Sequence, residues 1–202
     1  MWTERAAVMF FLWVGCTAGA WGATGDLDKL QMILRLHSEA DLHVPWLPAA
    51  QAITESIFED TGIGMRWIDC HGEAVDPQCN RAPRANEFVL RLQRRRVDPA
   101  SHACGVSLRS SRAEGHYITL YIDCIRAGSD AFNVGEPVLA AYTMAHEVGH
   151  LLLPVGHASS GIMRARPNRF DWERAKRGAL RFQPSERRQI HDALRRRLAS
   201  VR

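Results

Sequence analysis

Two histidines and a glutamate stand at a spacing that suits metal-dependent chemistry. The chain reads His146-Glu147-Val148-Gly149-His150. In a helix, residues four apart lie on one face, so both imidazoles can bind one metal ion, and Glu147 is turned about 100° away. Zinc lowers the pKa of a water that it binds, and a neighbouring carboxylate can accept that proton as the oxygen attacks a carbonyl. The pattern predicts His146 and His150 as metal ligands and Glu147 as general base.

A third ligand has two candidates in the sequence. After His150 the chain reads Leu151-Leu152-Leu153-Pro154-Val155-Gly156-His157. Proline ends the helix, and glycine allows a sharp bend that can return His157 toward the metal. The other candidate, Glu173, would have to lie on a second helix facing the first, but its neighbours are polar on nearly every side. We therefore favour His157, with a fourth position left for water.

A methionine-bearing turn, Ser160-Gly161-Ile162-Met163, follows the third histidine. With this turn, roughly residues 137–163 resemble the metzincin clan of zinc metallopeptidases, and in particular matrixin-like secreted bacterial proteins. The resemblance implies a Met-turn at Met163 beneath the metal, Glu147 as base, and a zinc site whose ligands are His146, His150 and His157.

The chain departs from the common metzincin motif at two positions. Leu153 stands where those proteins carry glycine, and His157 comes seven residues after His150 instead of six. The turn before the third histidine is therefore one residue longer than in the common motif.

The expected function is zinc-dependent hydrolysis of peptide bonds by a metal-bound water that Glu147 activates. The protein would be a zinc metalloendopeptidase acting on a peptide or protein substrate. The alternative is a non-catalytic zinc-binding scaffold or interaction protein that retains the site. Glu147 argues against this alternative, because a purely structural zinc site needs no base and normally closes its fourth position with a protein ligand.

The beginning of the chain is typical of a secretory signal peptide. An apolar run over residues 6–15 precedes the small residues Ala18-Gly19-Ala20. We expect residues 1–20 to be removed and residues 21–202 to form a single zincin-like domain. That domain would be secreted or periplasmic, with no stable membrane insertion. A retained membrane anchor and a lipoprotein attached through Cys16 are the alternatives.

Four cysteines remain after such cleavage: Cys70, Cys79, Cys104 and Cys124. An even number in an oxidising compartment predicts two disulfides. Among the three possible connectivities we favour the sequential one, because each pair flanks a short segment. A cysteine metal site is the alternative, but the chain has no Cys-x-x-Cys pair.

Apolar periodicity predicts a mixture of strands and helices. A final helix would run from Pro184 to Leu198, with Ser185 as its cap. The helix over 137–153 is apolar nearly all round, so we expect it to be buried. The remaining elements are strands over 30–36, 65–69, 87–94 and 116–124 and a helix over 49–60. The expected class is α+β, a zincin-like domain with a small twisted mixed sheet, a buried active-site helix and a C-terminal helix.

The positive charge is concentrated at the end of the chain. The net charge of the 202 residues is +4, but residues 164–202 hold thirteen basic and four acidic side chains. Arginine runs at 94–96 and 195–197 have no interleaved aromatic residues, which favours solvated faces over nucleic-acid binding. The positive charge would also allow attraction to acidic cell-surface polymers, but no other feature of the sequence supports it. We expect the protein to be a monomer.

Overall fold

The computed structural model describes residues 29–39, 42–71, 76–95, 103–109 and 114–200. The predicted signal peptide, residues 1–20 with Cys16, lies outside these ranges. None of the helices in the described ranges is long and apolar enough to cross a bilayer.

The described residues form a mixed α and β structure. The strands are β1 (Leu30–Ser38), β2 (Ile63–Asp69), β3 (Glu87–Gln93), β4 (Gly105–Leu108) and β5 (Tyr117–Tyr121). The helices are α1 (Leu47–Glu59), α2 (Ile122–Phe132), α3 (Glu136–Leu152), α4 (Arg169–Lys176) and α5 (Pro184–Ala199), with a short 3-10 helix, η1 (Pro77–Asn80). The α+β class predicted from the sequence is confirmed.

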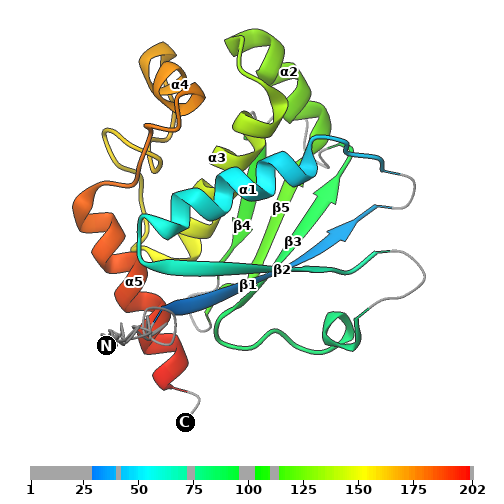
Figure 1. Cartoon of the computed structure of the whole chain (residues 1–202), viewed down its shortest axis with the longest axis vertical. Coiled ribbons are helices and arrows are strands. Elements are labelled where there is room, and N and C mark those ends of the chain that lie inside the picture. Colours follow the sequence, from blue (N-terminus) through cyan, green and yellow to red (C-terminus); the bar gives the residue numbers. More distant parts are fainter. Residues whose placement is uncertain (1–28, 40–41, 72–75, 96–102, 110–113, 201–202) are drawn as a thin grey trace, which may run out of the picture.

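The strands form one mixed sheet in the order β2-β1-β3-β5-β4. β1 is parallel to β2 and to β3, and β3 is parallel to β5. β4 runs antiparallel along β5 and is the edge strand. Figure 1 shows α1 and α3 crossing one face of this sheet, with α2 and α4 together at one end of the molecule.

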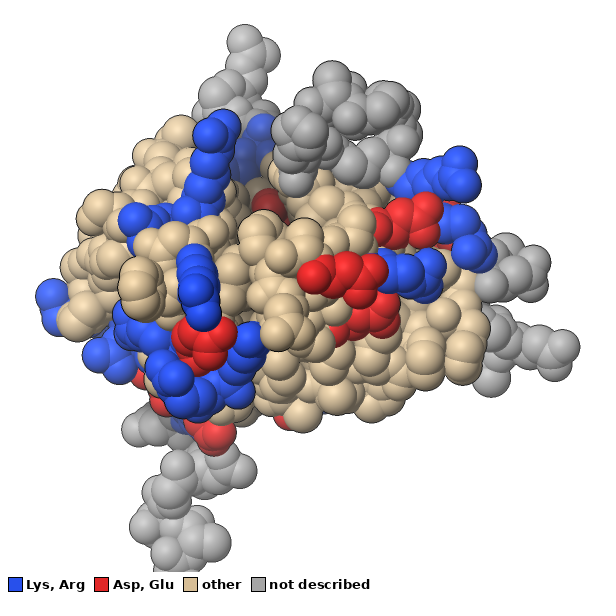
Figure 2. Space-filling view, turned by 90° about the horizontal axis from the view of Figure 1, so that it is seen from above, with Lys and Arg blue, Asp and Glu red and all other residues tan. Residues whose placement is uncertain are grey.

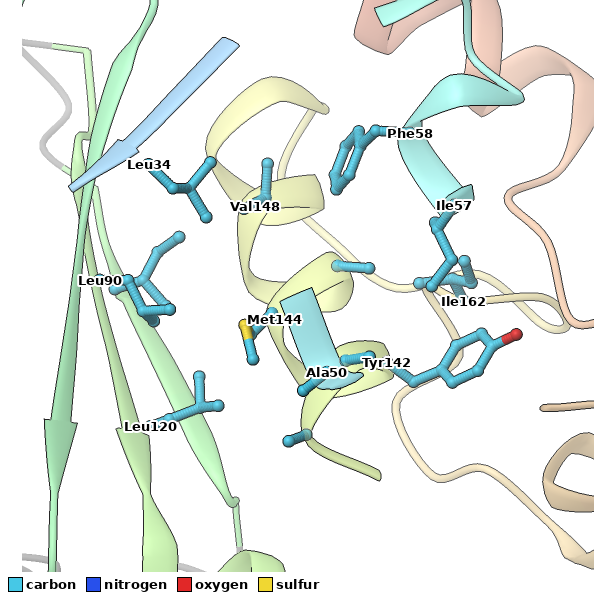
Figure 3. Packing of buried hydrophobic residues seen from close by; sticks show 14 of the residues in the cluster. Leu34, Ala50, Ile57, Phe58, Leu90, Leu120, Tyr142, Met144, Val148 and Ile162 are labelled. Carbon is cyan, nitrogen blue, oxygen red and sulfur yellow. The ribbon is translucent and has the colours of Figure 1, made fainter. Parts of the chain in front are cut away.

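The hydrophobic core lies between the sheet and α3. Alternate residues of a strand face the same side, and Leu34, Leu90 and Leu120 of three neighbouring strands are fully buried. They face Met144 and Val148 of α3 (Figure 3), which are fully buried as well. This packing fixes the position and rotation of α3, the helix that carries the candidate chemistry.

One predicted strand is too long. The strand expected over 116–124 ends at Tyr121, and Ile122 begins α2. Ile118 and Ile122 fit the alternation of a strand, but Ile122 and Ile125 are the buried residues of a helical turn instead. Helix α2, strand β4 and helix α4 were not predicted from the periodicity.

Two expectations for the C-terminal helix are wrong. Gln183, not Ser185, is the N-cap of α5, and its backbone N–H donates to the Glu186 carboxylate at 2.7 Å. The helix begins at Pro184 as predicted, because proline suits a first helical position, and the cap is therefore the residue before it. Arg197, expected on a solvated face, is 5% exposed and donates to the carbonyls of Gly115 and Leu151.

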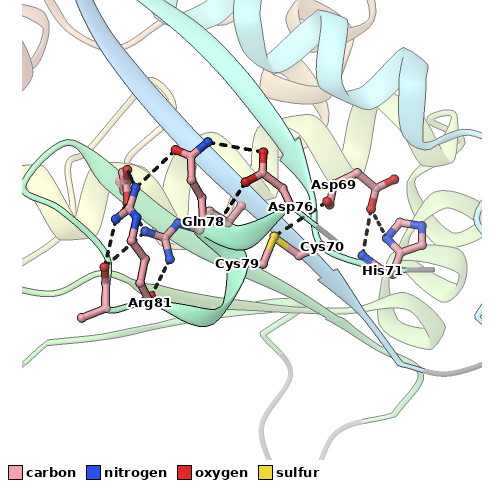
Figure 4. The surroundings of a disulfide bond; sticks show 10 residues. Asp69, Cys70, His71, Asp76, Gln78, Cys79 and Arg81 are labelled. Atoms are coloured by element: carbon pink, nitrogen blue, oxygen red, sulfur yellow. Dashed lines mark hydrogen bonds and ion pairs between the residues drawn. A yellow bond between two sulfur atoms is a disulfide. The ribbon is translucent and has the colours of Figure 1, made fainter. Parts of the chain in front are cut away.

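The structure contains two disulfides with the sequential pairing. Cys70 follows β2 and bonds to Cys79 of η1, among the polar contacts shown in Figure 4. Cys104 precedes β4 and bonds to Cys124 in the first turn of α2. Each bond stabilises the fold by about 2–4 kcal/mol. The second bond also ties the edge strand to the helix beside α3.

A buried ion cluster lies on the sheet face opposite α3. Arg35 of β1 and Glu87 of β3 are both 1% exposed and form an ion pair. Glu87 also accepts from Arg81 at 2.8 Å and from the backbone N–H of Arg84 at 3.0 Å. Burial raises the pKa of Glu87, but the hydrogen bonds from Arg81, Arg84 and Arg35 outweigh burial and hold this pKa at about 2. The carboxylate of Glu87 is thus paired with donors from the protein itself.

Candidate metal centre

Helix α3 places His146 and His150 one turn apart on the same side. Its buried residues include Met144 and Ala145 just before the first histidine and Val148 between the two. The helix ends at Leu152, and Leu153 is extended. Pro154 explains this end, because proline disfavours helical geometry at the preceding residue.

Two arginines hold the carbonyl end of α3. Arg109, after β4, donates to the carbonyl of His150 at 2.7 Å and to that of Leu153 at 2.6 Å. Arg197 of α5 donates to the carbonyl of Leu151 at 2.9 Å. The last carbonyls of a helix have no partner within the helix and carry partial negative charge, so cationic donors stabilise this end. The loop that follows therefore starts from a fixed point.

The loop from Leu153 brings His157 back to the helix. Gly156 has φ +130°, in the range that side-chain-bearing residues rarely adopt. One ring nitrogen each of His146, His150 and His157 lies within 4.8 Å of the others. The ring centroids of His146 and His150 are 4.6 Å apart, and those of His150 and His157 are 4.7 Å apart. The one-residue-longer turn thus still delivers the third imidazole.

The protein fixes the tautomer of His146. Nδ1 of His146 lies 2.8 Å from the carbonyl oxygen of Ile162. Since a carbonyl only accepts, Nδ1 carries the proton and Nε2 keeps its lone pair. Nε2 of His146 lies 3.0 Å from Nε2 of His150. This arrangement leaves the donor atom of His146 directed at the other two rings.

Burial favours the neutral, metal-binding form of two of the imidazoles, His146 and His150. Burial lowers the pKa of His146, which the hydrogen bond to Ile162 only partly opposes. Burial, together with the neighbouring His146, His157 and Arg109, lowers the pKa of His150 to about 4. Three imidazoles whose ring nitrogens converge fit a divalent transition-metal ion. The cluster can therefore hold a metal ion, with His157 as the most exposed of the three.

Glu147 is buried beside the histidines and faces the edge strand. It is 7% exposed. A Cβ at Gly105 of β4 would lie 2.8 Å from Cγ of Glu147, so glycine is needed for this close approach. Burial raises the pKa of Glu147, while hydrogen bonds from the side chain and backbone of Ser107 and the nearby His157 act in the opposite direction. A carboxylate with a raised pKa is suited to accept a proton.

Met163 lies beneath the histidine helix and explains a glycine in that helix. Met163 is 2% exposed, and a Cβ at Gly149 would lie 2.4 Å from its sulfur. Gly149 therefore leaves the space that the Met163 side chain occupies. The turn is closed by the Arg164 N–H, which donates to the carbonyl of Gly161 at 3.2 Å.

Glu173 does not lie in the histidine cluster. It is in α4, where it accepts from Lys176 at 3.0 Å and has a side chain 43% exposed. A helix does form here, because Asn168 and Asp171 form a capping box at its start and Trp172 and Ala175 are buried. The carboxylate nevertheless points to a lysine of its own helix.

A cavity of about 390 Å³ opens beside the histidine helix. Its wall includes His146 and Glu147, and it is mostly apolar. Trp172 of α4 and Phe132 of α2 line it and stack on each other at 5.5 Å. A more open hollow of about 440 Å³ lies between the end of α1 and α5, but its lining includes none of the three clustered histidines.

Sequence reasoning missed the residues that surround the motif. Gly105, Ser107 and Arg109 all come from the stretch around β4, and Arg109 is 41 positions before its partner His150. No local pattern marks them, because their role depends on β4 lying along α3.

The whole sequence matches no protein-family model and no curated protein.

Proposed function

We propose that this protein is a secreted, zincin-like metallopeptidase that hydrolyses peptide bonds. Zinc would be bound by His146, His150 and His157, and Glu147 would be the general base. The observation that carries the proposal is the convergence of three ring nitrogens within 4.8 Å beside a buried carboxylate with a raised pKa. A structural zinc site would have no use for such a base.

Each residue of the site has a distinct task in this reaction. A bound zinc ion would acidify water and polarise the scissile carbonyl. Glu147 would accept the proton of the attacking water and deliver it to the leaving amine. Ser107 orients the Glu147 carboxylate, and the carbonyl of Ile162 orients the ring of His146. Burial raises the pKa of Glu147, which favours acceptance of a proton.

The surroundings of Glu147 suit an extended polypeptide. β4 is an edge strand, so one side of its backbone has no partner strand within the described sheet. An extended peptide can add to such an edge through main-chain hydrogen bonds. One substrate side chain would then enter the cavity beside His146. These two features support a polymer substrate with a backbone to pair and a side chain to bury.

Secretion is supported by the cysteines. The two disulfides, Cys70–Cys79 and Cys104–Cys124, are of a kind that persists in oxidising compartments.

The proposal is tested by metal analysis of the purified chain beginning at residue 21, paired with turnover of a broad peptide library. Stoichiometric zinc and cleavage that a chelator abolishes and zinc restores are expected. Bound zinc without cleavage of any peptide would instead support the non-catalytic scaffold. Cleavage that survives complete metal removal would contradict the mechanism.

A further inference from the structure

The rim of the cavity beside Glu147 is strongly basic on one side. Residues 164–181 hold seven basic side chains and two acidic ones. Figure 2 shows Lys and Arg side chains gathered on the side of the molecule that carries α4, whereas carboxylates and arginines mix on the α2 side. The two walls of the cavity thus differ in charge.

Most carboxylates near the basic wall are already engaged. Asp171, 5% exposed, pairs with Arg164 at 2.9 Å, and Glu173 pairs with Lys176 at 3.0 Å. Arg181 pairs with Asp60. Four cations of this wall have no carboxylate partner among the described residues: Arg166, Arg169, Arg174 and Arg177. Basic side chains on this wall therefore outnumber the carboxylates that pair with them.

Arg166 is the uncompensated arginine that also lines the cavity. Arg164 lines it as well, but its guanidinium is committed to buried Asp171. Arg166 is exposed and follows Ala165 in the segment between Met163 and α4. The apolar side chains of Leu180 and Trp172 line the same cavity. An occupant of the cavity would therefore place an apolar group inside and meet a cation at the rim.

We propose that Arg166 selects acidic polypeptide segments in which an apolar side chain, seated in the cavity, is flanked by carboxylates. This inference rests on the proposed function for its site but concerns binding alone. The α2 side of the molecule lacks a comparable excess of positive charge. There Arg126 lies 3.9 Å from Asp123 of α2 and 3.4 Å from Glu136 at the start of α3. A basic peptide would meet Arg166 with like charge.

The test compares three labelled peptides that differ only beside a central leucine, which is flanked by glutamates, glutamines or lysines. Fluorescence anisotropy with the zinc-loaded chain from residue 21 gives the dissociation constants at an ionic strength of about 0.05 M, where exposed charges still interact over about 10 Å. The glutamate peptide is expected to bind about three- to fivefold more tightly than the glutamine peptide. The lysine peptide should bind most weakly.

Arg166→Gln should abolish this preference. Arg177→Gln is the matched control, because it removes the same charge from the same wall at a residue that does not line the cavity. Equal binding of the glutamate and glutamine peptides, no binding of any peptide, or equal losses in the two variants would overturn the proposal.

Metal removal separates the inference from direct binding of a carboxylate to the metal. The preference should persist in chelator-treated protein, because it comes from Arg166. A preference that disappears with the metal would contradict the role of Arg166. Cleavage is read separately: binding preference without hydrolysis would refute the proposed function and retain the inference, whereas hydrolysis without preference would do the reverse.

Discussion

The Glu87 cluster and the histidine cluster are both groups of ionisable side chains. They differ in how far these side chains find charged or hydrogen-bonding partners within the protein. Glu87 is surrounded by Arg35, Arg81 and the N–H of Arg84, and its pKa lies at about 2. At the other site burial raises the pKa of Glu147 and lowers the pKa of His146. The Glu87 carboxylate is thus paired with donors of the protein itself, whereas the histidine cluster keeps nitrogen lone pairs that a ligand can use.

This contrast explains why one cluster stabilises the fold and the other suits chemistry. Favourable ion pairs around Glu87 lower the free energy of the folded state at neutral pH. Burial without matching charges, as at Glu147, costs stability and leaves a group ready to exchange a proton.

Glu147→Gln should remove turnover and leave the metal in place. Glutamine keeps the size of the side chain but cannot accept the proton, so kcat/KM on a cleaved peptide should fall by about 10²–10⁴-fold. Zinc content by metal analysis should match that of the parent. Glu173→Gln, at an exposed carboxylate of α4, is the control and should retain activity. Parent-like turnover in Glu147→Gln would end the proposed mechanism.

Glu87→Gln should destabilise the fold without touching the histidines. The change leaves Arg35 buried without its counter-charge, which costs about 3–5 kcal/mol of the free energy of unfolding. Urea denaturation measures the loss. Glu59→Gln serves as control, because Glu59 pairs with Lys29 at the surface and should change stability by less than about 1 kcal/mol. Similar losses in both variants would refute a special role for the buried cluster.

The same carboxylate should make stability depend on acid pH. The folded pKa of Glu87, about 2, is below its ordinary value of 4.5. Its contribution is therefore complete above pH 4.5 and is lost as the pH falls toward 2. The contribution is on the order of 3 kcal/mol. Urea unfolding between these pH values should show a shallower pH dependence in Glu87→Gln, and an unchanged slope would contradict the assignment.

His157→Ala should weaken zinc binding, and Glu173→Ala should not. Loss of a ligand should raise the dissociation constant by more than the roughly 10–100-fold that loss of an outer partner causes. Competition with a chromogenic chelator gives the constants for both variants. Weakened zinc binding in Glu173→Ala with parent-like zinc binding in His157→Ala would contradict His157 as the third ligand and assign that role to Glu173.

Arg109→Ala should have the smallest effect on stability. It removes the side chain that holds the end of α3, from which the loop with His157 starts. The carbonyls of His150 and Leu153 would lose their guanidinium donor, which should lower the free energy of unfolding by about 1 kcal/mol. Thermal unfolding measures this change. Arg95→Ala is the control, because the Arg95 side chain is 84% exposed and its nearest carboxylate is at 3.4 Å. An equal shift in both variants would show that the anchor contributes nothing.

Local patterns were sufficient for several features of this protein. The spacing of His146 and His150 follows from the helical repeat, and the alternation in β1 and β3 follows from the pleat of a strand. The disulfides join cysteines only 9 and 20 positions apart. Features of this kind depend on residues that are close in sequence, so their spacing carries the information.

Other features were decided only by tertiary structure. The sequence did not reveal that Gly105 and Ser107 would lie against Glu147, or that Gly149 makes room for Met163. It also placed Arg197 in solvent, whereas the structure buries it against the end of α3. These contacts arise because the strand order β2-β1-β3-β5-β4 lays β4 along the histidine helix and because α5 folds back onto α3. Side-chain periodicity fixes which face of an element is buried, but the packing of the whole chain decides which distant residue meets that face.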